Sequence, residues 1–508
     1  MEPTKRIIVN TIAQYTKAIV TLCLSLYSTR LILKALTVSD FGVYSVVGGV
    51  VAMLGFITNA LVITTQRYIS FYHGKKDLET VKKVFKNSIF LHVIIGIVLS
   101  AILLSMRGFI IDNVLNIPQD RIHTASIVFA ITIFMLFLTI VTAPFKALFI
   151  AHENIVFIAV VDIVDSVIKL SLAICLLYIQ ADKLLIYSLM MALILLLNLI
   201  VFATFSLLKY EECSLYVHKK DIDKLYLFQL IGFAGWTTYG MGAVAGRNQG
   251  TAIILNHFFG TAINAAYGIS FQVFGAISFV VTSIMNAINP QIMKAEGGKD
   301  RNKMLTLACK ECKFSASLLA IVTIPLLFEM PTILGIWLEE VPDYTALFCR
   351  FVLISFIFDQ TTLGLQTANQ AIGSIRKYTL LTYTPKLLYL LVIWLMLKHG
   401  YSVASIMWVY LLIEIYVAAQ RIPLLKKEAG LSIKQFWDQV IKRIIPLCLL
   451  ECMSCMICQS IFMHEKLGFL PTIIIAIATG LLSAWFFTLD KEEQLYVTNA
   501  IKRQKKHV

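Results

Sequence analysis

Residues 184–208 have the sequence LLIYSLMMALILLLNLIVFATFSLL, which contains no charged residue. A helix of about 20 such residues crosses the hydrocarbon core of a membrane. The rest of the chain has the same character, because 58% of its 508 residues are hydrophobic and only 15% are charged. Soluble domains contain about 45–50% apolar and about 25% charged residues, so the charges here are too few to cover a soluble surface. The sequence therefore predicts an all-α polytopic membrane protein.

Apolar runs of similar length recur along the whole chain. The polar joints between them are short, and none has room for a soluble catalytic domain. We predict about 14 transmembrane helices, with ends uncertain by about four residues. The predicted spans are 7–33, 42–66, 86–106, 123–148, 154–179, 184–208, 227–255, 262–289, 312–337, 345–371, 378–397, 402–420, 440–462 and 467–489.

Basic residues predict the orientation of these spans. With the N-terminus in the cytoplasm, 32 of the 44 Lys and Arg residues lie in cytoplasmic segments or within four residues of the cytoplasmic end of a span, six lie on the opposite side and six lie elsewhere within the spans. Such a bias is typical of cytoplasmic loops, so we expect both termini in the cytoplasm. The bias also accounts for most of the net charge of +14 without a nucleic-acid partner. We interpret the basic tail 501–508 as a cytoplasmic membrane anchor.

A weak internal repeat divides the chain. Tyr44 and Asp77 match Tyr267 and Asp300 at an offset of 223 residues, and HGKKD in the first half is echoed by GGKD in the second. Parallel repeats of this kind are known among transporters. We therefore predict an N-terminal six-helix lobe with its linker at 1–226, and a C-terminal six-helix lobe at 227–425. Two extra helices and the basic tail follow at 426–508.

The first span has polar residues at helical spacing. Asn10, Gln14 and Lys17 lie on one predicted face, and Arg30 ends the span. This face is either the wall of an aqueous cavity or a set of interhelical hydrogen-bonding groups. We favour the cavity, because a deep lysine is a poor hydrogen-bonding link between helices.

Other charges recur deeper in the chain. Asp162, Asp165 and Lys169 share a face of the fifth span, as either a neutralised pair or a site of ion coupling. Arg247 lies among glycines in the seventh span, which predicts a bend. The eighth span adds Asn264 and Gln272 to the polar groups of the cavity.

Ionisable residues within a membrane usually face a cavity or a partner. Several basic residues in one cavity suit an anionic substrate, and arginine matches phosphate oxygens. The predicted substrate-binding residues are Lys17, Arg30, Lys169, Arg247 and Lys386. The predicted residues for coupling to a proton or sodium ion are Asp359, Asp162 and Asp165, and Asp359 is favoured because no basic residue lies four positions away.

Motifs for nucleotide hydrolysis, acyl transfer and metal binding are missing from the sequence, so we expect a protein that is not an enzyme and has no cofactor or metal site. Cys452, Cys455 and Cys458 have C-x-x-C spacing and Cys448 lies four residues before them, but all four fall within a span without a surrounding loop. We interpret them as packing residues.

Four segments resemble the Wzx-like polysaccharide flippases, which belong to the superfamily that also contains the MATE exporters. They are ITTQRYISFYHGKKD (63–77), APFKALFIAHEN (143–154), GTAIILNHFFGTAINAAYGISFQV (250–273) and NPQIMKAEGGKD (289–300). The resemblance covers nearly the whole chain. It implies two six-helix lobes forming a V around a central cavity, two additional helices and a location in a bacterial inner membrane. It also implies an undecaprenyl-diphosphate-linked oligosaccharide as substrate, for O-antigen or capsule synthesis, and a polysaccharide polymerase as partner.

Two other functions compete with this interpretation. A MATE-type multidrug antiporter coupled to cations is the alternative transporter, but it predicts a net acidic cavity. A membrane glycosyltransferase or polymerase predicts a large outer loop or a soluble catalytic domain, which the spacing of the spans does not allow.

Overall fold

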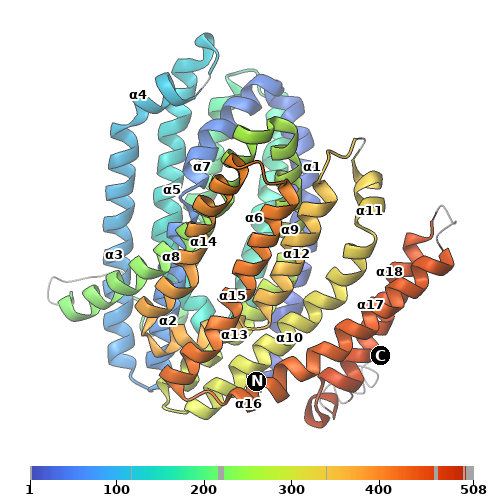
Figure 1. The fold of residues 1–508 in the computed structure, drawn as a ribbon. Coiled ribbons are helices and arrows are strands. Elements are labelled where there is room, and N and C mark those ends of the chain that lie inside the picture. Colours follow the sequence, from blue (N-terminus) through green and yellow to red (C-terminus); the bar gives the residue numbers. More distant parts are fainter. Residues whose placement is uncertain are drawn as a thin grey trace, which may run out of the picture. The chain divides into compact units, whose positions relative to one another are not determined.

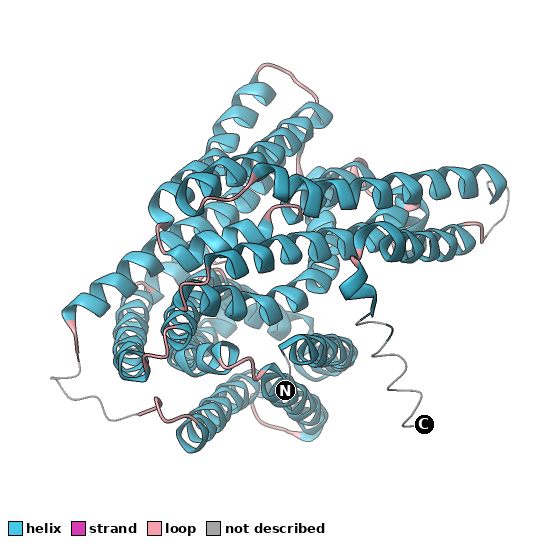
Figure 2. Ribbon diagram, turned by 90° about the horizontal axis from the view of Figure 1, so that it is seen from below, coloured by secondary structure: helices cyan, strands magenta, loops and turns pink. Residues whose placement is uncertain are grey.

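The computed structural model describes residues 3–115, 117–214, 222–338, 340–462, 467–495 and 498. Every regular element in these ranges is a helix, and Figure 2 shows helices joined by loops. The described residues group into two compact units, one from Met1–Gly242 and Asn289–Lys299, the other from Ala243–Ile288 and Asp300–Val508. The basic tail 501–508 lies outside the described residues. The division into lobes at residues 226 and 425 stays a prediction.

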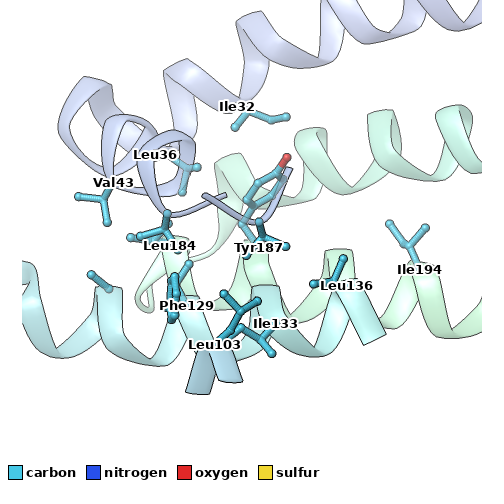
Figure 3. Close-up of a cluster of buried hydrophobic side chains, with 14 of the residues drawn as sticks. Ile32, Leu36, Val43, Leu103, Phe129, Ile133, Leu136, Leu184, Tyr187 and Ile194 are labelled. Carbon is cyan, nitrogen blue, oxygen red and sulfur yellow. The ribbon is translucent and has the colours of Figure 1, made fainter. Parts of the chain in front are cut away.

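The first unit is built mainly from the helices that precede residue 210. They are α1 (Pro3–Ala52), α2 (Gly55–Gly74), α3 (Leu78–Ser105), α4 (Arg107–Phe109), η1 (Ile110–Val114), η2 (Gln119–Arg121), α5 (Ile122–Ala151), α6 (Ile155–Tyr178) and α7 (Lys183–Lys209). Helix α5 packs against α2, α3 and α7, and α6 packs against α1. Apolar side chains of α1, α3, α5 and α7 form its core (Figure 3). The sequence of α5 explains this central position, because its many apolar residues cover most of its circumference.

Two long helices contribute residues to both units. Helix α8 spans Lys224–Phe259 and α9 spans Thr261–Gly297. The glycines around Arg247 do not interrupt α8, which is one continuous helix, and the predicted bend there stays a prediction. Instead, Gly250 allows a close contact, since a Cβ atom there would lie 2.7 Å from the side chain of Leu390.

The second unit contains the remaining helices (Figure 1). They are α10 (Arg301–Phe328), α11 (Met330–Trp337), α12 (Thr345–Gln360), α13 (Leu363–Ile372), α14 (Ile375–Lys398), α15 (Val403–Ala429), α16 (Ile433–Phe436), η4 (Trp437–Ile441), α17 (Lys442–Phe462), α18 (Phe469–Ser483) and η5 (Ala484–Thr488). Helix α15 packs against α12, α13 and α14, and α10 packs against α12, α13 and α17. The C-x-x-C cysteines lie along α17 as free thiols.

Each of the predicted spans falls on a helix or on a pair of consecutive helices. Within the described residues, ten helices are long and apolar enough to cross a membrane, or eleven if the bent pair α12 and α13 forms one span. The predicted joint at 34–41 lies within the continuous helix α1, which extends to Ala52, and the part of α1 that is long and apolar enough to span a membrane ends at Leu36. Residues 34–41 (KALTVSDF) contain no proline or glycine, so a helix can continue through them. The chain is an all-α polytopic membrane protein.

The repeated motifs adopt the same local structure. Lys76 and Lys299 have φ angles of 56° and 61°. The next residue, Asp77 or Asp300, then caps the following helix by accepting a hydrogen bond from the backbone of Thr80 or Lys303, at 3.0 Å in both cases. Hydrogen bonds from Thr80 also lower the pKa of Asp77. The repeat seen in the sequence therefore corresponds to two equivalent turns.

Candidate functional site

Three buried charges meet where α8, α14 and α15 pack in the second unit. Arg247, Lys386 and Glu414 are each at most 6% exposed. In α15, Tyr410 and Arg421 lie four residues before and seven after Glu414, which places all three on one helical face. Helices α14 and α15 pack along each other, so Lys386 reaches this face (Figure 1).

Glu414 accepts hydrogen bonds from both cations. Arg247 forms an ion pair with it through Nη1. Lys386 Nζ lies 2.8 and 3.0 Å from its two carboxylate oxygens. Arg247 also donates from Nη2 to the Tyr410 hydroxyl at 3.0 Å, and its guanidinium carbon lies 4.4 Å from the centre of the Tyr410 ring. Buried charges are tolerated when they are paired and hydrogen-bonded in this way.

A second ion pair lies on the same face of α15. Arg421 Nη2 donates to Asp359 Oδ1 at 2.7 Å, and its Nη1 donates to the Asp359 carbonyl at 3.0 Å. It also contacts the side chains of Thr362 and Gln366, at 3.3 and 3.2 Å. Helix α12 ends at Gln360 and α13 continues at an angle of 48°, so the break exposes carbonyl groups to this arginine.

We call these five residues the unit-2 ion cluster: Arg247, Lys386, Glu414, Asp359 and Arg421. The two ion pairs interact, because Lys386 lies within the electrostatic range of Asp359 and Arg421. Three cations face two carboxylates, so the cluster carries a formal net charge of +1. The predicted residues Arg247, Lys386 and Asp359 are brought together here.

The other predicted charges belong to the first unit. Lys17 of α1 pairs with Asp162 of α6. Asp165 pairs with Lys169 one turn later at 2.7 Å, as the spacing predicted, and also accepts a hydrogen bond from Asn198 at 2.7 Å. These contacts correspond to the neutralised pair, and a coupling role for either aspartate stays a prediction.

The remaining predicted residues are dispersed. Asn10 is buried and donates to the Glu153 carbonyl at 2.9 Å, and Gln14 is buried beside it on α1. Arg30 is exposed on α1 and forms no ion pair with a described residue. Asn264 is half-buried and Gln272 is exposed, both on α9. Their place in a shared cavity stays a prediction.

Sequence reasoning missed two important members of the site. Glu414 lies within the predicted span 402–420 but was assigned no role, and Arg421 lies one residue beyond that span. Helix α15 in fact extends to Ala429, and Arg421 is only 3% exposed. The helical spacing of Tyr410, Glu414 and Arg421 was the available signal, but the span boundary separated Arg421 from the others.

Solved structures with the same fold are transporters. An outward-facing multidrug resistance MATE family transporter of the MOP superfamily has a TM-score of 0.71 and 11% identity, over 85% of this chain and 96% of that chain. A MOP superfamily transporter from Pyrococcus furiosus, described by the reverse polarity of its binding pocket, has a TM-score of 0.68 and 10% identity, over 85% and 96%. A mutant of the Vibrio cholerae MATE transporter VcmN has a TM-score of 0.70 and 16% identity, over 84% and 96%.

The sequence matches no protein-family model and no curated protein. At 10–16% identity, the structural likeness establishes the fold. It is the fold that the resemblance of the four sequence segments implied, whereas membership of the superfamily and of its flippase branch belongs to the proposal below. The chain has the fold of the MATE transporters of the MOP superfamily.

Proposed function

We propose that this protein is a flippase that moves an undecaprenyl-diphosphate-linked oligosaccharide from the cytoplasmic to the periplasmic leaflet by alternating access. The observation that carries the proposal is the net positive charge of the unit-2 ion cluster. The proposed setting is a bacterial inner membrane, where the product would reach a polysaccharide polymerase.

The charge balance of the cluster supports an anionic substrate. Two cations, Arg247 and Lys386, share the single carboxylate of Glu414. A diphosphate group offers several oxygens to such donors, and arginine binds phosphate through two parallel hydrogen bonds. A substrate that takes over one of these cations leaves Glu414 paired with the other, so no buried charge is left alone.

The Pyrococcus furiosus transporter offers a parallel within the same fold. Its binding pocket is described as having reverse polarity, which is taken to suggest a different function. The excess of positive charge in the unit-2 ion cluster would likewise distinguish this chain from a transporter of cations. A site of net charge +1 repels a cationic substrate.

The proposal is tested by flipping in proteoliposomes, with a fluorescent lipid-linked oligosaccharide and an enzyme that cleaves only the outward-facing sugar. We expect Arg247→Ala to slow flipping by about ten- to a hundredfold, as the loss of a charged hydrogen bond implies. Arg247→Lys should flip at an intermediate rate, because the positive charge remains but the two parallel hydrogen bonds of the guanidinium are lost. Arg350→Ala is the matched control, since Arg350 is exposed on α12 and, among the described residues, donates only to the Leu327 carbonyl.

Two results contradict the proposal. One is wild-type flipping no faster than in empty liposomes. The other is uptake of a cationic drug against a sodium or proton gradient, which would instead identify a MATE-type antiporter.

The same liposomes test energy coupling, for which Asp359 is the leading candidate and Asp162 and Asp165 are the others. Protonation of Asp359 would break its ion pair with Arg421 and leave that arginine to the neighbouring carbonyl and side-chain oxygens. If an imposed gradient accelerates the wild type, Asp359→Asn should abolish the acceleration. A variant that still responds to the gradient excludes Asp359.

A further inference from the structure

Two histidines and a glutamate meet at one end of the first unit, away from the unit-2 ion cluster. His73 lies in the last turn of α2, His152 directly follows α5, and Glu212 follows α7. Glu212 Oε1 lies 3.0 Å from His73 Nε2 and 2.5 Å from His152 Nε2. The three ligand atoms lie within 4.8 Å of one another, and among the described residues they form the one such group of His, Cys, Asp and Glu.

The side chains are held in place by their surroundings. The side chain of Glu212 is only 3% exposed, whereas those of His73 and His152 are 22% and 26% exposed. The His152 ring stacks on Tyr210, with centroids 4.1 Å apart and planes 18° apart. Asn154 donates to the Tyr210 hydroxyl at 3.1 Å, which fixes that ring in turn. The cluster is therefore ordered on one side and open to water on the other.

We propose that His73, His152 and Glu212 bind a divalent transition-metal ion, with Zn²⁺ as the best match. Two imidazole nitrogens and one carboxylate oxygen are ligands that Zn²⁺ prefers, at about 2.0–2.2 Å each. Such bonds place neighbouring ligand atoms about 3.3 Å apart in a tetrahedron, so the observed spacing needs shifts of less than about 1 Å. The exposed side leaves room for water as a fourth ligand.

The charges around the cluster are compatible with a cation. Zn²⁺ binds imidazole in its neutral form, so metal binding would displace the proton between each histidine Nε2 and Glu212 Oε1. Lys294 of α9 is paired with Glu153 at 2.6 Å, so its charge is already neutralised by a carboxylate. With both rings neutral, as metal ligation requires, the carboxylate of Glu212 would give the three ligands a total charge of −1.

A metal at this position would tie three separate segments together. His73 and Glu212 are 139 residues apart, and His152 comes from a third helix end. The ion would stabilise the ends of α2, α5 and α7 in the first unit, because it binds the folded state alone. This role is independent of the proposed transport function.

The test uses full-length protein in detergent, with any affinity tag removed and metal stripped by chelation. Calorimetry with ZnCl₂ should give one strong site per chain. CoCl₂ should give the visible absorption of a four-coordinate site, which free ions lack. Added Zn²⁺ should raise the melting temperature of the wild type.

Glu212→Gln and His152→Gln should each weaken Zn²⁺ binding by at least about tenfold, since even outer-shell changes weaken metal sites by about 10–100-fold. His257→Gln is the matched control, because His257 is exposed on α8 outside the cluster. The apo variants must keep the wild-type elution volume, and if Glu212→Gln does not, His73→Gln replaces it. Two results would overturn the proposal: the wild type binds less than one equivalent of Zn²⁺, or His257→Gln weakens Zn²⁺ binding as much as the cluster variants do. Either result would mean that the three residues form only a hydrogen-bonded cluster.

Discussion

At the scale of single residues, replacement by glutamine should affect protein stability very differently at two buried glutamates, Glu414 and Glu451. Glu414 neutralises Arg247 and Lys386, so Glu414→Gln leaves two cations facing a neutral amide. Breaking a buried ion pair on one side costs about 3–5 kcal/mol. We expect a large fall in the melting temperature of the detergent-solubilised protein, followed by tryptophan fluorescence.

Glu451 of α17 provides the comparison. It is fully buried, and neither carboxylate oxygen has a hydrogen-bond partner among the described residues. Such a group is tolerated in an apolar environment as the neutral acid. Glu451→Gln replaces one neutral group by another of the same shape and should change stability by less than about 1 kcal/mol. A larger loss for Glu451→Gln than for Glu414→Gln would contradict both assignments.

At the scale of elements, the crossing of α2 and α9 in the first unit depends on two glycines. A Cβ atom on Gly74 would meet the main-chain oxygen of Lys294, and one on Gly297 would meet that of Phe71. The repeat offset of 223 relates residue 74 to 297 and residue 71 to 294, so the crossing has internal two-fold symmetry. Close backbone contact through small residues is how membrane helices pack without a hydrophobic driving force.

We therefore expect Gly297→Ala to separate these helices and destabilise the protein by about 1–3 kcal/mol, as overpacking does elsewhere. The measurement is thermal unfolding, with Gly275→Ala as control. Gly275 also lies in α9, but no atom lies within 4 Å of a Cβ added there. Alanine at 275 should be neutral or slightly stabilising, since it favours helix by about 1 kcal/mol over glycine. Equal effects at both positions would mean that the close contact is not required.

At the scale of the whole molecule, the bias of basic residues predicts which joints face the cytoplasm. Lys75, Glu211 and Asn302 are exposed residues of the joints 67–85, 209–226 and 290–311. In a chain whose exposed Cys23 and Cys175 are replaced by serine, single cysteines at these positions should react with a maleimide only when it can cross the membrane.

Lys398→Cys gives the opposite expectation, because Lys398 is exposed in a predicted periplasmic joint. It should react with an impermeant maleimide in intact spheroplasts. Reaction of any of the three cytoplasmic positions with the impermeant reagent would break the topology of fourteen spans.

Local features of this protein follow from the sequence alone. The length and spacing of apolar runs located the helices, because a lipid-exposed span must satisfy its backbone hydrogen bonds internally. The four-residue spacing of Asp165 and Lys169 predicted their ion pair, because helix geometry places such residues side by side. The echo of HGKKD in GGKD corresponded to two equivalent helix caps.

Only the tertiary structure decided which distant groups meet. Arg421 lies 62 residues from Asp359, Arg247 lies 167 residues from Glu414, and no local spacing links either pair. The cluster of His73, His152 and Glu212 is likewise without a sequence motif, so the sequence predicted no metal site. Periodicity along one helix shows which residues share a face, but the partner of that face depends on how the helices pack and at what height they align. That choice is made by side-chain packing across the whole unit, and a single sequence does not display it.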